Sequence, residues 1–461
     1  MIMKKTEQGQ IIVILALAMV AILGITALAI DGSLIYNARR QDQNTADSAA
    51  LAGAGAAANY LKEVGSGELI CGKPEGTQAT LLAIKAIHDS VAVDGISAAE
   101  MPKLTNDTEL AAADQGFTIT CKWYGGLGIQ YLDFHVKVST EMDTSFARVV
   151  GQNTLKTSVE STARVYPTQP FAYGNGLVSL SDLCSTKQGG IEFLGTSETV
   201  INSGGVFSNS CLKMNTGLVN VTGGSIQYWH ESECKDCFSN PKVSPEPVPA
   251  YTKLPKDMIR PPECPAKTPA NTNSAKKGEY QDVAGVGIFP GWYTTGIQVP
   301  NGKTLTLNPG LYCIEGDMTN NSGTTLIAKG VTLYFLDGDL TLNQNDDGKV
   351  ELISCPLEPC YTAPTSPDWA AVKGLLMYFD PSYQAVIKMN GGSTNSFKGT
   401  IFGSNANFTL NGNTETTSGE SFAFSTQIVG NWIEVAGKAD LLMNLNATDF
   451  VSMPPSISLV K

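Results

Sequence analysis

The stretch "AIDGSLIYNARRQDQNTADSAALAGAGAAA", residues 29–58, decides how the chain begins to fold. It joins an uncharged apolar run to an alanine-rich polar pattern, and it contains no proline. Helix formers continue from Ser33 to about Leu61, so we expect one helix that leaves the apolar run and continues as a stalk. Gly32 is the weakest point of this helix, because glycine loses the most conformational freedom there.

The apolar run itself predicts a transmembrane helix. It reads IIVILALAMVAILGITALAI, residues 11–30, and carries no charge. At ~1.5 Å per residue this length spans about 30 Å of hydrocarbon. A cleaved signal peptide has a shorter apolar core and a small-residue cleavage site, whereas here Asp31 and a helix follow directly. We therefore expect an uncleaved single-pass anchor in the lipid bilayer, with residues 1–10 in the cytoplasm.

Cysteine usage predicts the side of the membrane on which the body lies. Flanking charge leaves the orientation open, because Lys4 and Lys5 are balanced by Arg39 and Arg40. The chain has ten cysteines, all after the anchor, and an even number suits disulfides in an oxidising compartment. We therefore expect the body outside the cytoplasm, in the periplasm or at the cell surface. The disulfide candidates are Cys71, Cys121, Cys184, Cys211, Cys234, Cys237, Cys264, Cys313, Cys355 and Cys360.

Length and charge limit the classes of protein that remain. A chain of 461 residues is long enough for two or three domains, each with its own core. Its net charge is -12 and charged residues make up 16% of it, so the basic surface that binds nucleic acid is missing. We expect no nucleic-acid partner.

Residues 31–167 predict a stalk helix with a small α+β domain. Residues 77–93 have the apolar spacing of a second helix, and Cys71 with Cys121 is a candidate closure. Three segments alternate apolar and polar residues as strands do: 117–124, 130–140 and 155–167.

Small residues recur along one side of the stalk helix. They are Ala46, Ala49, Ala50, Gly53 and Ala57. This spacing permits close packing, and the favoured interpretation is an amphipathic helix that covers its own domain. The alternative is a seam through which a surface-filament subunit assembles with its own copies.

Several of these features resemble the TadE/TadG-like family of tight-adherence (Flp) pilus-assembly proteins. The residues that carry the resemblance are Gly9-Gln10, Asp31, Tyr36, Arg39-Arg40, Gln41, "ADSAALAGA" at 46–54, and later "TSFARVVG" and "STARV". The resemblance covers about residues 7–167 and implies a pilin-like α+β domain. Family members with a prepilin-peptidase site carry a Glu five residues after the cleavage glycine, where this chain has Ile14. The resemblance therefore implies the TadG-like branch, which retains its anchor.

Residues 168–461 predict a right-handed parallel β-helix, or β-solenoid. Short apolar runs separated by Gly, Asn, Ser and Thr return at a period of about 20 residues, which is typical of stacked coils. Pieces such as GVTLYFLDGDLTL are also similar to β-helical tails attached to TadE/TadG-like anchors. The recurring series are Ile191 and Leu212, Val206 and Ile226, Ile297, Met318 and Leu340, and Leu311, Val331 and Leu352. Residues 229–281 break the period and are rich in Cys and Pro, so we expect an extended excursion there.

An acidic cluster raises the alternative of a membrane-tethered carbohydrate-active enzyme. Asp337, Asp339, Asp346 and Asp347 lie close in sequence, and glycoside hydrolysis needs two carboxylates about 5–10 Å apart. Asp-Gly and Asn-Asp are also strong turn compositions, which account for all four residues. The turn interpretation is favoured, and we expect no catalytic residues.

Histidines and cysteines raise the alternative of a zinc site. His230, Cys234, Cys237 and Cys264 have the residue types of a tetrahedral site. Thiols outside the cytoplasm usually oxidise, so disulfides are favoured over zinc. His88 and His135 lie in ordinary helix and strand patterns.

A second candidate metal motif is Asp31-Gly32-Ser33-Leu34-Ile35, which lacks the second serine of a metal-binding D-x-S-x-S. We therefore expect no metal and no cofactor.

The sequence as a whole favours a non-enzymatic, membrane-anchored protein of Flp pilus assembly or cell-surface adhesion. Pilus-assembly or filament proteins and surface glycans are the candidate partners. Glycan binding would use ladders of hydrogen-bonding groups along the β-solenoid. The residues that suggest such ladders are Thr304, Thr306, Asn407, Thr409, Asn411 and Asn413.

Overall fold

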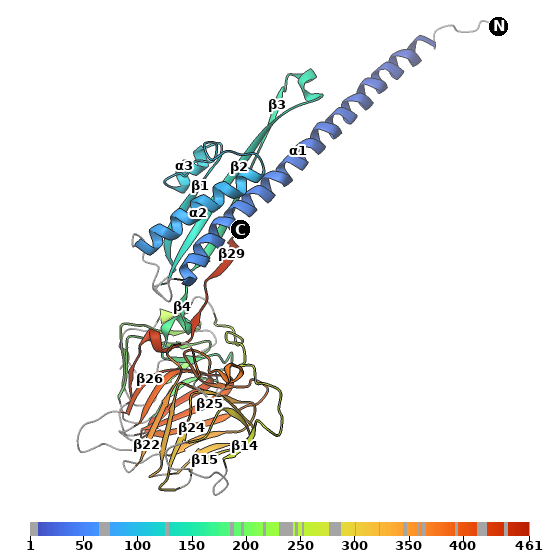
Figure 1. Ribbon diagram of the computed structural model, residues 1–461. Helices are drawn as coiled ribbons and strands as arrows, with labels where there is room; N and C mark the ends of the chain where they lie inside the picture. The colour runs from blue at the N-terminus through green and yellow to red at the C-terminus, as the bar shows by residue number, and fades with distance from the viewer. Residues whose placement is uncertain are drawn as a thin grey trace, which may run out of the picture. The chain divides into compact units, whose positions relative to one another are not determined.

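The chain forms two compact units in the computed structural model (Figure 1). Unit 1 is Met1–Gln169 together with Pro454–Lys461, and unit 2 is Pro170–Met453. The chain therefore crosses between the units twice. The structure describes residues 8–63, 74–124, 129–184, 189–194, 198–214, 218–229, 243–244, 248–250, 253–275, 287–299, 301–321, 323–343, 348–357, 359–361, 366–391, 395–412, 422–437 and 441–460.

Unit 1 begins with one long helix, α1 (Gln8–Glu63), which contains both the apolar run and the alanine-rich pattern. The helix passes through Asp31, Gly32 and Ser33 without interruption, as expected from the sequence. The Ser33 hydroxyl donates to the Ile30 carbonyl oxygen at 2.8 Å, so this polar side chain is satisfied inside the helix. Two further helices follow, α2 (Pro74–Val93) and α3 (Asp107–Ala112).

An antiparallel sheet completes unit 1. Its strand order is β1-β2-β3-β29, with β2 and β3 joined by a turn that contains the 3-10 helix η2 (Ala147–Val150). The three strands predicted from alternation match the first three observed ones to within three residues. The bounds are β1 Gly116–Tyr124, β2 Ile129–Asp143, β3 Thr154–Tyr166 and β29 Ser456–Val460.

The small-residue side of α1 is buried inside unit 1. Ala46, Ala49, Ala50 and Ala57 have no exposed surface and belong to the core formed with α2 and the sheet. At Gly53 an added Cβ would lie 2.8 Å from Ile87 Cγ1, so only glycine allows this close approach. The interpretation that this side covers its own domain is confirmed, and it is not a free seam for filament assembly.

The C-terminal strand differs from the expected domain organisation. The predicted boundary between residues 167 and 168 lies close to the first crossing, but residues 454–461 belong to unit 1 rather than to the second domain. β29 pairs antiparallel with β3, with Ser456 opposite Tyr166. Pro454 and Pro455 interrupt the preceding structure, and the SISLV pattern that follows suits an edge strand.

Unit 2 is built around a large barrel-like sheet of 23 described strands, whose pairings are parallel. Parallel strands need a crossover between partners, so sequence neighbours are joined by corners rather than hairpins. The first strands are β5 Leu177–Ser179, β6 Gly190–Phe193, β7 Glu198–Asn202, β8 Val206–Ser208, β9 Leu212–Met214, β10 Leu218–Thr222, β11 Ile226–Tyr228, β12 Val243–Ser244, β13 Val248–Pro249 and β14 Thr272–Ala275.

The remaining strands of this sheet are β15 Gly291–Val299, β16 Thr304–Leu307, β17 Gly310–Ile314, β18 Met318–Asn320, β19 Thr325–Lys329, β20 Val331–Phe335, β21 Leu340–Asn343, β22 Lys349–Ile353, β23 Leu375–Phe379, β24 Val386–Gly391, β25 Ser396–Gly412, β26 Phe422–Gly437 and β27 Leu441–Asn444. Short elements flank it: β4 Gln169–Pro170, β28 Ser452–Met453, η3 Phe171–Gly174, η5 Pro367–Trp369 and η6 Ala447–Asp449.

The strand register shows which recurring positions were predicted correctly. Three series consist of residues directly opposite one another: Ile191 and Leu212, Val206 and Ile226, and Ile297, Met318 and Leu340. The fourth series is wrong. Val331 lies opposite Gly310 rather than Leu311, and Leu352 lies opposite Ala328. Apolar residues fill consecutive positions of these buried strands, so spacing alone does not fix the register.

The last strands of unit 2 pair with its first strands. β26 pairs with β5 and β6, and β27 pairs with β7. Ile433 lies opposite Ile191, so segments separated by more than 200 residues are adjacent in the sheet. The polar partners agree with this pairing, because Asn202 donates to the side chain of Asn444 at 2.8 Å.

Both faces of several strands in unit 2 are buried. Phe335 and Phe379 stack inside the sheet at 4.6 Å between ring centroids, while Tyr334 and Tyr378 belong to a second cluster. That cluster packs against the described part of the proline-rich excursion. Burial on both faces explains why VTLYF and LLMYF read as continuous apolar runs rather than alternating ones.

The described part of the excursion is held on unit 2 by polar contacts. The buried side chain of Asn209 accepts from the Leu254 N–H and donates to the Leu254 carbonyl oxygen, both at 2.7 Å. Further along, the Tyr378 hydroxyl donates to the Ile259 carbonyl oxygen at 3.4 Å. Residues far apart in sequence therefore hold this segment in an extended course.

We predict that Gly53→Leu destabilises unit 1 by about 1–3 kcal/mol, because the side chain overpacks the contact with Ile87. Gly55→Leu is the matched control, since a Cβ there meets nothing within 4 Å and leucine favours the helix. The described α-helices belong to unit 1, so thermal loss of helical circular dichroism measures its unfolding. Equal melting temperatures for the two variants would contradict the close packing at Gly53.

Candidate functional site

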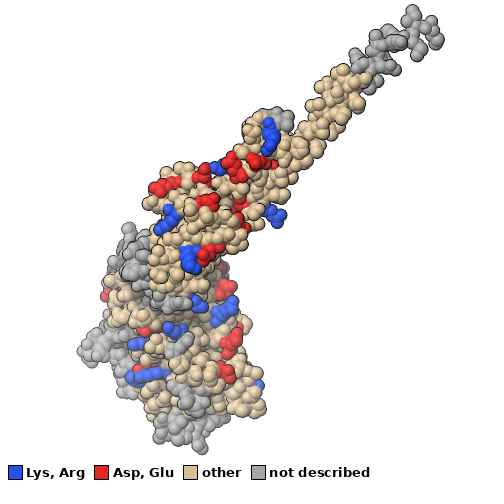
Figure 2. Space-filling model, turned by 45° about the horizontal axis from the view of Figure 1, so that its top comes forward, with Lys and Arg blue, Asp and Glu red and all other residues tan. Residues whose placement is uncertain are grey.

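The first part of α1 is the candidate membrane anchor. Among the described residues, α1 is a helix long and apolar enough to cross a membrane. Its large apolar side chains from Ile12 to Leu28 are 56–76% exposed, so the protein itself does not cover them. Figure 2 shows this part of the helix without acidic or basic residues. Such a surface is stable in hydrocarbon and unfavourable in water.

Asp31 ties the end of this apolar run to the β2–β3 hairpin. One carboxylate oxygen accepts from the Ser145 N–H at 2.9 Å, and the other accepts from the N–H groups of Phe146 and Ala147 at 3.0 and 2.7 Å. These N–H groups open the 3-10 helix η2, where no helical partner is available. Asp31 therefore fixes the tip of the hairpin at the end of the apolar run.

The charge state of Asp31 follows from this site. Burial of the carboxyl raises its pKa, but the three backbone N–H donors and the nearby Arg148 outweigh burial, so the pKa of Asp31 is lowered. A lowered pKa means that the carboxylate stabilises the fold above the unfolded value of about 4. That contribution is lost as the pH falls through the lower folded value.

A second aspartate joins α1 to the same two strands. Asp42 is 4% exposed and accepts from the hydroxyls of Thr140, at 2.6 Å, and Thr157. These two threonines lie directly opposite each other in β2 and β3. Nearby, the Thr45 hydroxyl donates to Asp94 at 2.6 Å. The helix is therefore attached to its domain by polar contacts as well as by its alanine face.

Sequence reasoning did not find this role of the two aspartates. In the sequence, Asp31 stands out as the residue that follows the apolar run, as part of the family resemblance and as the start of an incomplete metal motif, whereas Asp42 does not stand out. The available signal was their spacing, because eleven residues are about three helical turns and place both on one side of the helix. Ala46 and Ala49 lie on that side too, and all four residues are buried.

The acidic cluster considered for catalysis caps backbone groups in unit 2. Asp337 accepts from the Gly316 N–H at 2.5 Å, and Asp339 accepts from the Val386 N–H at 2.9 Å. The Asp339 N–H donates to the Asp317 carboxylate at 2.8 Å, so neighbouring corners are linked to each other. These contacts are those of turn residues. Asp346 and Asp347 lie outside the described residues.

The described histidines make structural contacts. His88 lies 3.0 Å from the Met101 carbonyl oxygen and packs edge-on against Phe117. His135 lies 3.4 Å from a carboxylate oxygen of Asp107 and 3.4 Å from one of Glu160. His230 lies outside the described residues. Within the part of the chain that the structure describes, His, Cys, Asp and Glu form no group placed to hold a metal ion.

Disulfides account for the described cysteines. Three pairs lie in unit 2: Cys184 with Cys211, Cys264 with Cys313, and Cys355 with Cys360. The zinc alternative required Cys264 as a ligand and is wrong in that respect, because its sulfur is bonded to Cys313. In unit 1, Cys121 is disulfide-bonded. Cys71, Cys234 and Cys237 lie outside the described residues.

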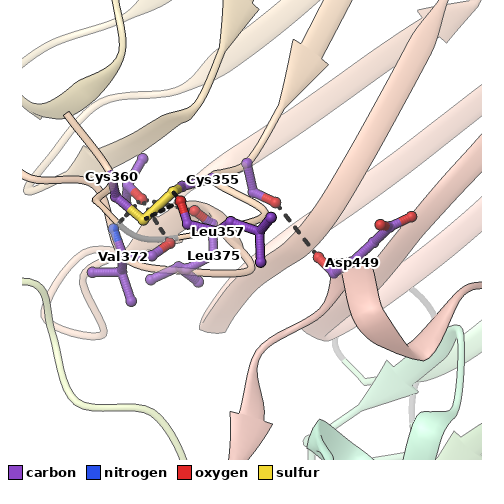
Figure 3. The surroundings of a disulfide bond; sticks show 8 residues. Cys355, Leu357, Cys360, Val372, Leu375 and Asp449 are labelled. Atoms are coloured by element: carbon purple, nitrogen blue, oxygen red, sulfur yellow. Dashed lines mark hydrogen bonds between the residues drawn. A yellow bond between two sulfur atoms is a disulfide. The ribbon is translucent and has the colours of Figure 1, made fainter. Parts of the chain in front are cut away.

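The Cys355–Cys360 disulfide closes a small loop at a strand end (Figure 3). Backbone bonds hold its base, because the Ala371 N–H donates to the Cys360 carbonyl oxygen and the Gly374 N–H to that of Cys355. Leu357 inside the loop is 72% exposed. The disulfide and these backbone bonds are the contacts of a structural closure.

Asn407 and Asn411, two of the six residues that suggest a glycan-binding ladder, pair with other asparagines of the sheet. Asn411 donates to the Asn390 side chain at 2.8 Å, and Asn390 donates to Asn343 at 2.6 Å. Asn407 accepts from the Asn431 side chain at 3.1 Å. These amides stack between neighbouring strands and stabilise the corners. Thr304 is exposed, Thr306 and Thr409 are half-buried, and Asn413 lies outside the described residues.

A shallow groove of ≈ 340 Å³ lies between α1 and α2, and the sequence did not indicate it. Its rim carries the exposed ion pair of Lys85 and Asp89, at 3.1 Å. The residues that line it are Ala56, Asn59, Tyr60, Leu82, Lys85, Ala86 and Asp89. This lining has no cluster of groups suited to catalysis.

These observations define a class of protein with an apolar N-terminal helix that suits a membrane anchor, a small domain attached along that helix, and a disulfide-braced parallel sheet. Residues 9–57 match the family model described as "Putative Flp pilus-assembly TadE/G-like". The resemblance found in the sequence is confirmed over this range, which includes nearly all of the apolar run together with Asp31 and Asp42. No match was found among curated proteins or solved structures.

We predict that Asp42→Ala weakens the attachment of α1 to β2 and β3 by about 1–3 kcal/mol, because two threonine hydroxyls lose their acceptor. Asp47→Ala is the matched control, since Asp47 accepts a local hydrogen bond from Gln43, one turn away on the same helix, and its loss should change stability by less than about 0.5 kcal/mol. Hydrogen exchange of the amides in β2 and β3 measures the difference. Equal exchange in both variants would show that Asp42 is not needed.

We predict that replacing Cys264 and Cys313 by serine frees the excursion while leaving the parallel sheet folded. The lost cross-link is worth about 2–4 kcal/mol, chiefly through the freedom of the released segment. Trypsin should then cleave faster after the exposed Lys256. The matched control replaces Cys355 and Cys360, which close a separate loop. Faster cleavage at Lys256 in that control as well would point to general unfolding instead.

Proposed function

We propose that the chain is a non-enzymatic, membrane-anchored extracytoplasmic protein of Flp pilus assembly. The observation that carries this proposal is the position of the TadE/G-like match, because residues 9–57 contain the exposed apolar segment and continue into the buried face of α1. In this proposal residues 11–30 cross the bilayer, residues 1–10 face the cytoplasm, and unit 2 is displayed in the periplasm or at the cell surface.

Disulfide chemistry supports the extracytoplasmic side. The three described pairs of unit 2 are of the kind that persists in oxidising compartments and is rare in the cytoplasm. The use of Asp337 and Asp339 as turn ligands supports a role without catalysis. The internal use of Asn407 and Asn411 favours assembly over glycan adhesion.

We further propose that the parallel sheet of unit 2 is a right-handed β-solenoid. This proposal is supported by a regular pairing in which a strand pairs with the third strand after it, as β16 does with β19 and β19 with β22. The corresponding sequence steps, such as Leu305 to Leu326 to Val350, are close to the length of one coil. A stack of this kind presents a stiff surface suited to contacts with other assembly proteins.

The orientation can be tested by protease treatment of intact spheroplasts. We expect unit 2 to be degraded and residues 1–10 to stay protected, because only the body lies outside. An epitope tag at each end reports the two fragments. Protection of the body together with free, reactive thiols at Cys264 and Cys313 would reverse the proposed topology.

The role in assembly is tested by deleting the chain from its host and scoring surface pili. We expect pili to be lost, and restored by the wild-type chain. A variant with three charged substitutions in residues 11–30 should fail to restore them, because charges at the bilayer centre cost about 2.5–3.5 kcal/mol each. Normal piliation in the deletion strain would overturn the assembly role, and screening the body against surface glycans would then test adhesion.

A further inference from the structure

The tip of the β2–β3 hairpin, residues 145–151, carries exposed groups beside the end of the anchor. Phe146 is 44% exposed, and Arg148 is exposed. Figure 1 shows this hairpin alongside α1. The core of unit 1 does not use the Phe146 ring, although a buried ring of this size contributes strongly to stability.

The level of the tip along α1 is set by Asp31. Its carboxylate binds the backbone N–H groups of Ser145, Phe146 and Ala147 at 2.7–3.0 Å, and Asp31 directly follows the last residue of the apolar run. If residues 11–30 span the hydrocarbon, these contacts hold the Phe146 backbone at the boundary between hydrocarbon and headgroups.

The neighbouring surface of α1 has the composition of a membrane interface. Tyr36 is 68% exposed and lies six residues beyond Ile30, about 9 Å further along the helix. Arg39 and Arg40 follow and are exposed. Aromatic rings and basic side chains gather at the headgroup level of membrane proteins, where rings contact acyl chains and cations contact phosphates.

We propose that the hairpin tip is a second membrane contact, in which Phe146 enters the bilayer interface and Arg148 lies among lipid phosphates. This inference rests on the proposed function in one respect, the spanning of the bilayer by residues 11–30. With the tip docked, the anchor helix and the hairpin hold unit 1 at two points, so its tilt relative to the membrane is restricted.

The test uses the full chain in lipid nanodiscs and tryptophan as the reporter. Phe146→Trp and the positive control Tyr36→Trp place an indole at the proposed interface. Leu81→Trp is the negative control, because Leu81 is 55% exposed on α2. Leu82, the next residue, lines the groove together with Ala56. Ala56 lies about 39 Å along α1 from Ile30, so a tryptophan at position 81 is far from the proposed interface. The fluorescence of the wild-type chain, with its five tryptophans, is subtracted in each case.

Lipids brominated near the glycerol end of their acyl chains should quench the fluorescence of the tryptophan at position 146 at least about two-fold more strongly than that of the tryptophan at position 81. This is the result expected for a ring at the membrane interface. Ser145→Trp repeats the measurement if Phe146→Trp does not fold. Quenching at 145 and 146 no stronger than at 81, in chains that co-elute with nanodiscs, would overturn the membrane contact of the tip. Failure to co-elute would instead overturn the proposed anchor.

Discussion

The fold of unit 1 depends on one helix that must be compatible with two different surroundings. The first part of α1 exposes branched apolar side chains, whereas the part after residue 30 packs closely against α2 and the sheet. The close packing requires small residues, because at Gly53 even a methyl group would lie 2.8 Å from Ile87. Asp31 and Asp42 add the directional contacts that alanines lack, and they fix how the helix is rotated on the sheet.

Much of this could be predicted from the sequence, because the relevant signals are local. The uncharged run, the absence of proline and the small residues at helical spacing are properties of one continuous segment. Three of the four recurring series in unit 2 were also in true register. The series through Leu311 failed because apolar residues occupy both faces of β17 and β20, so the pattern carries no information about register there.

Contacts between distant segments were beyond the reach of the sequence. Nothing in the pattern around Ile433 indicates that it lies opposite Ile191, because many strands of this sheet carry an apolar residue that could take that place. The hydrogen bonds of Asp31 were hidden for the same reason, since its partners are 114–116 residues away and are backbone N–H groups that any residue supplies. Asp337 and Asp339 cap backbone groups between strands, as the turn interpretation expected, because turn composition is local.

The pairing of β29 with β3 makes unit 2 an insertion within the sheet of unit 1. The two connections leave from Tyr166 and Ser456, which lie opposite each other in adjacent antiparallel strands. A mechanical load on unit 2 therefore reaches unit 1 through two covalent tethers instead of one. Twisting about a single bond is suppressed, and each tether carries part of the force. Such a double tether transmits torque as well as pull from one unit to the other.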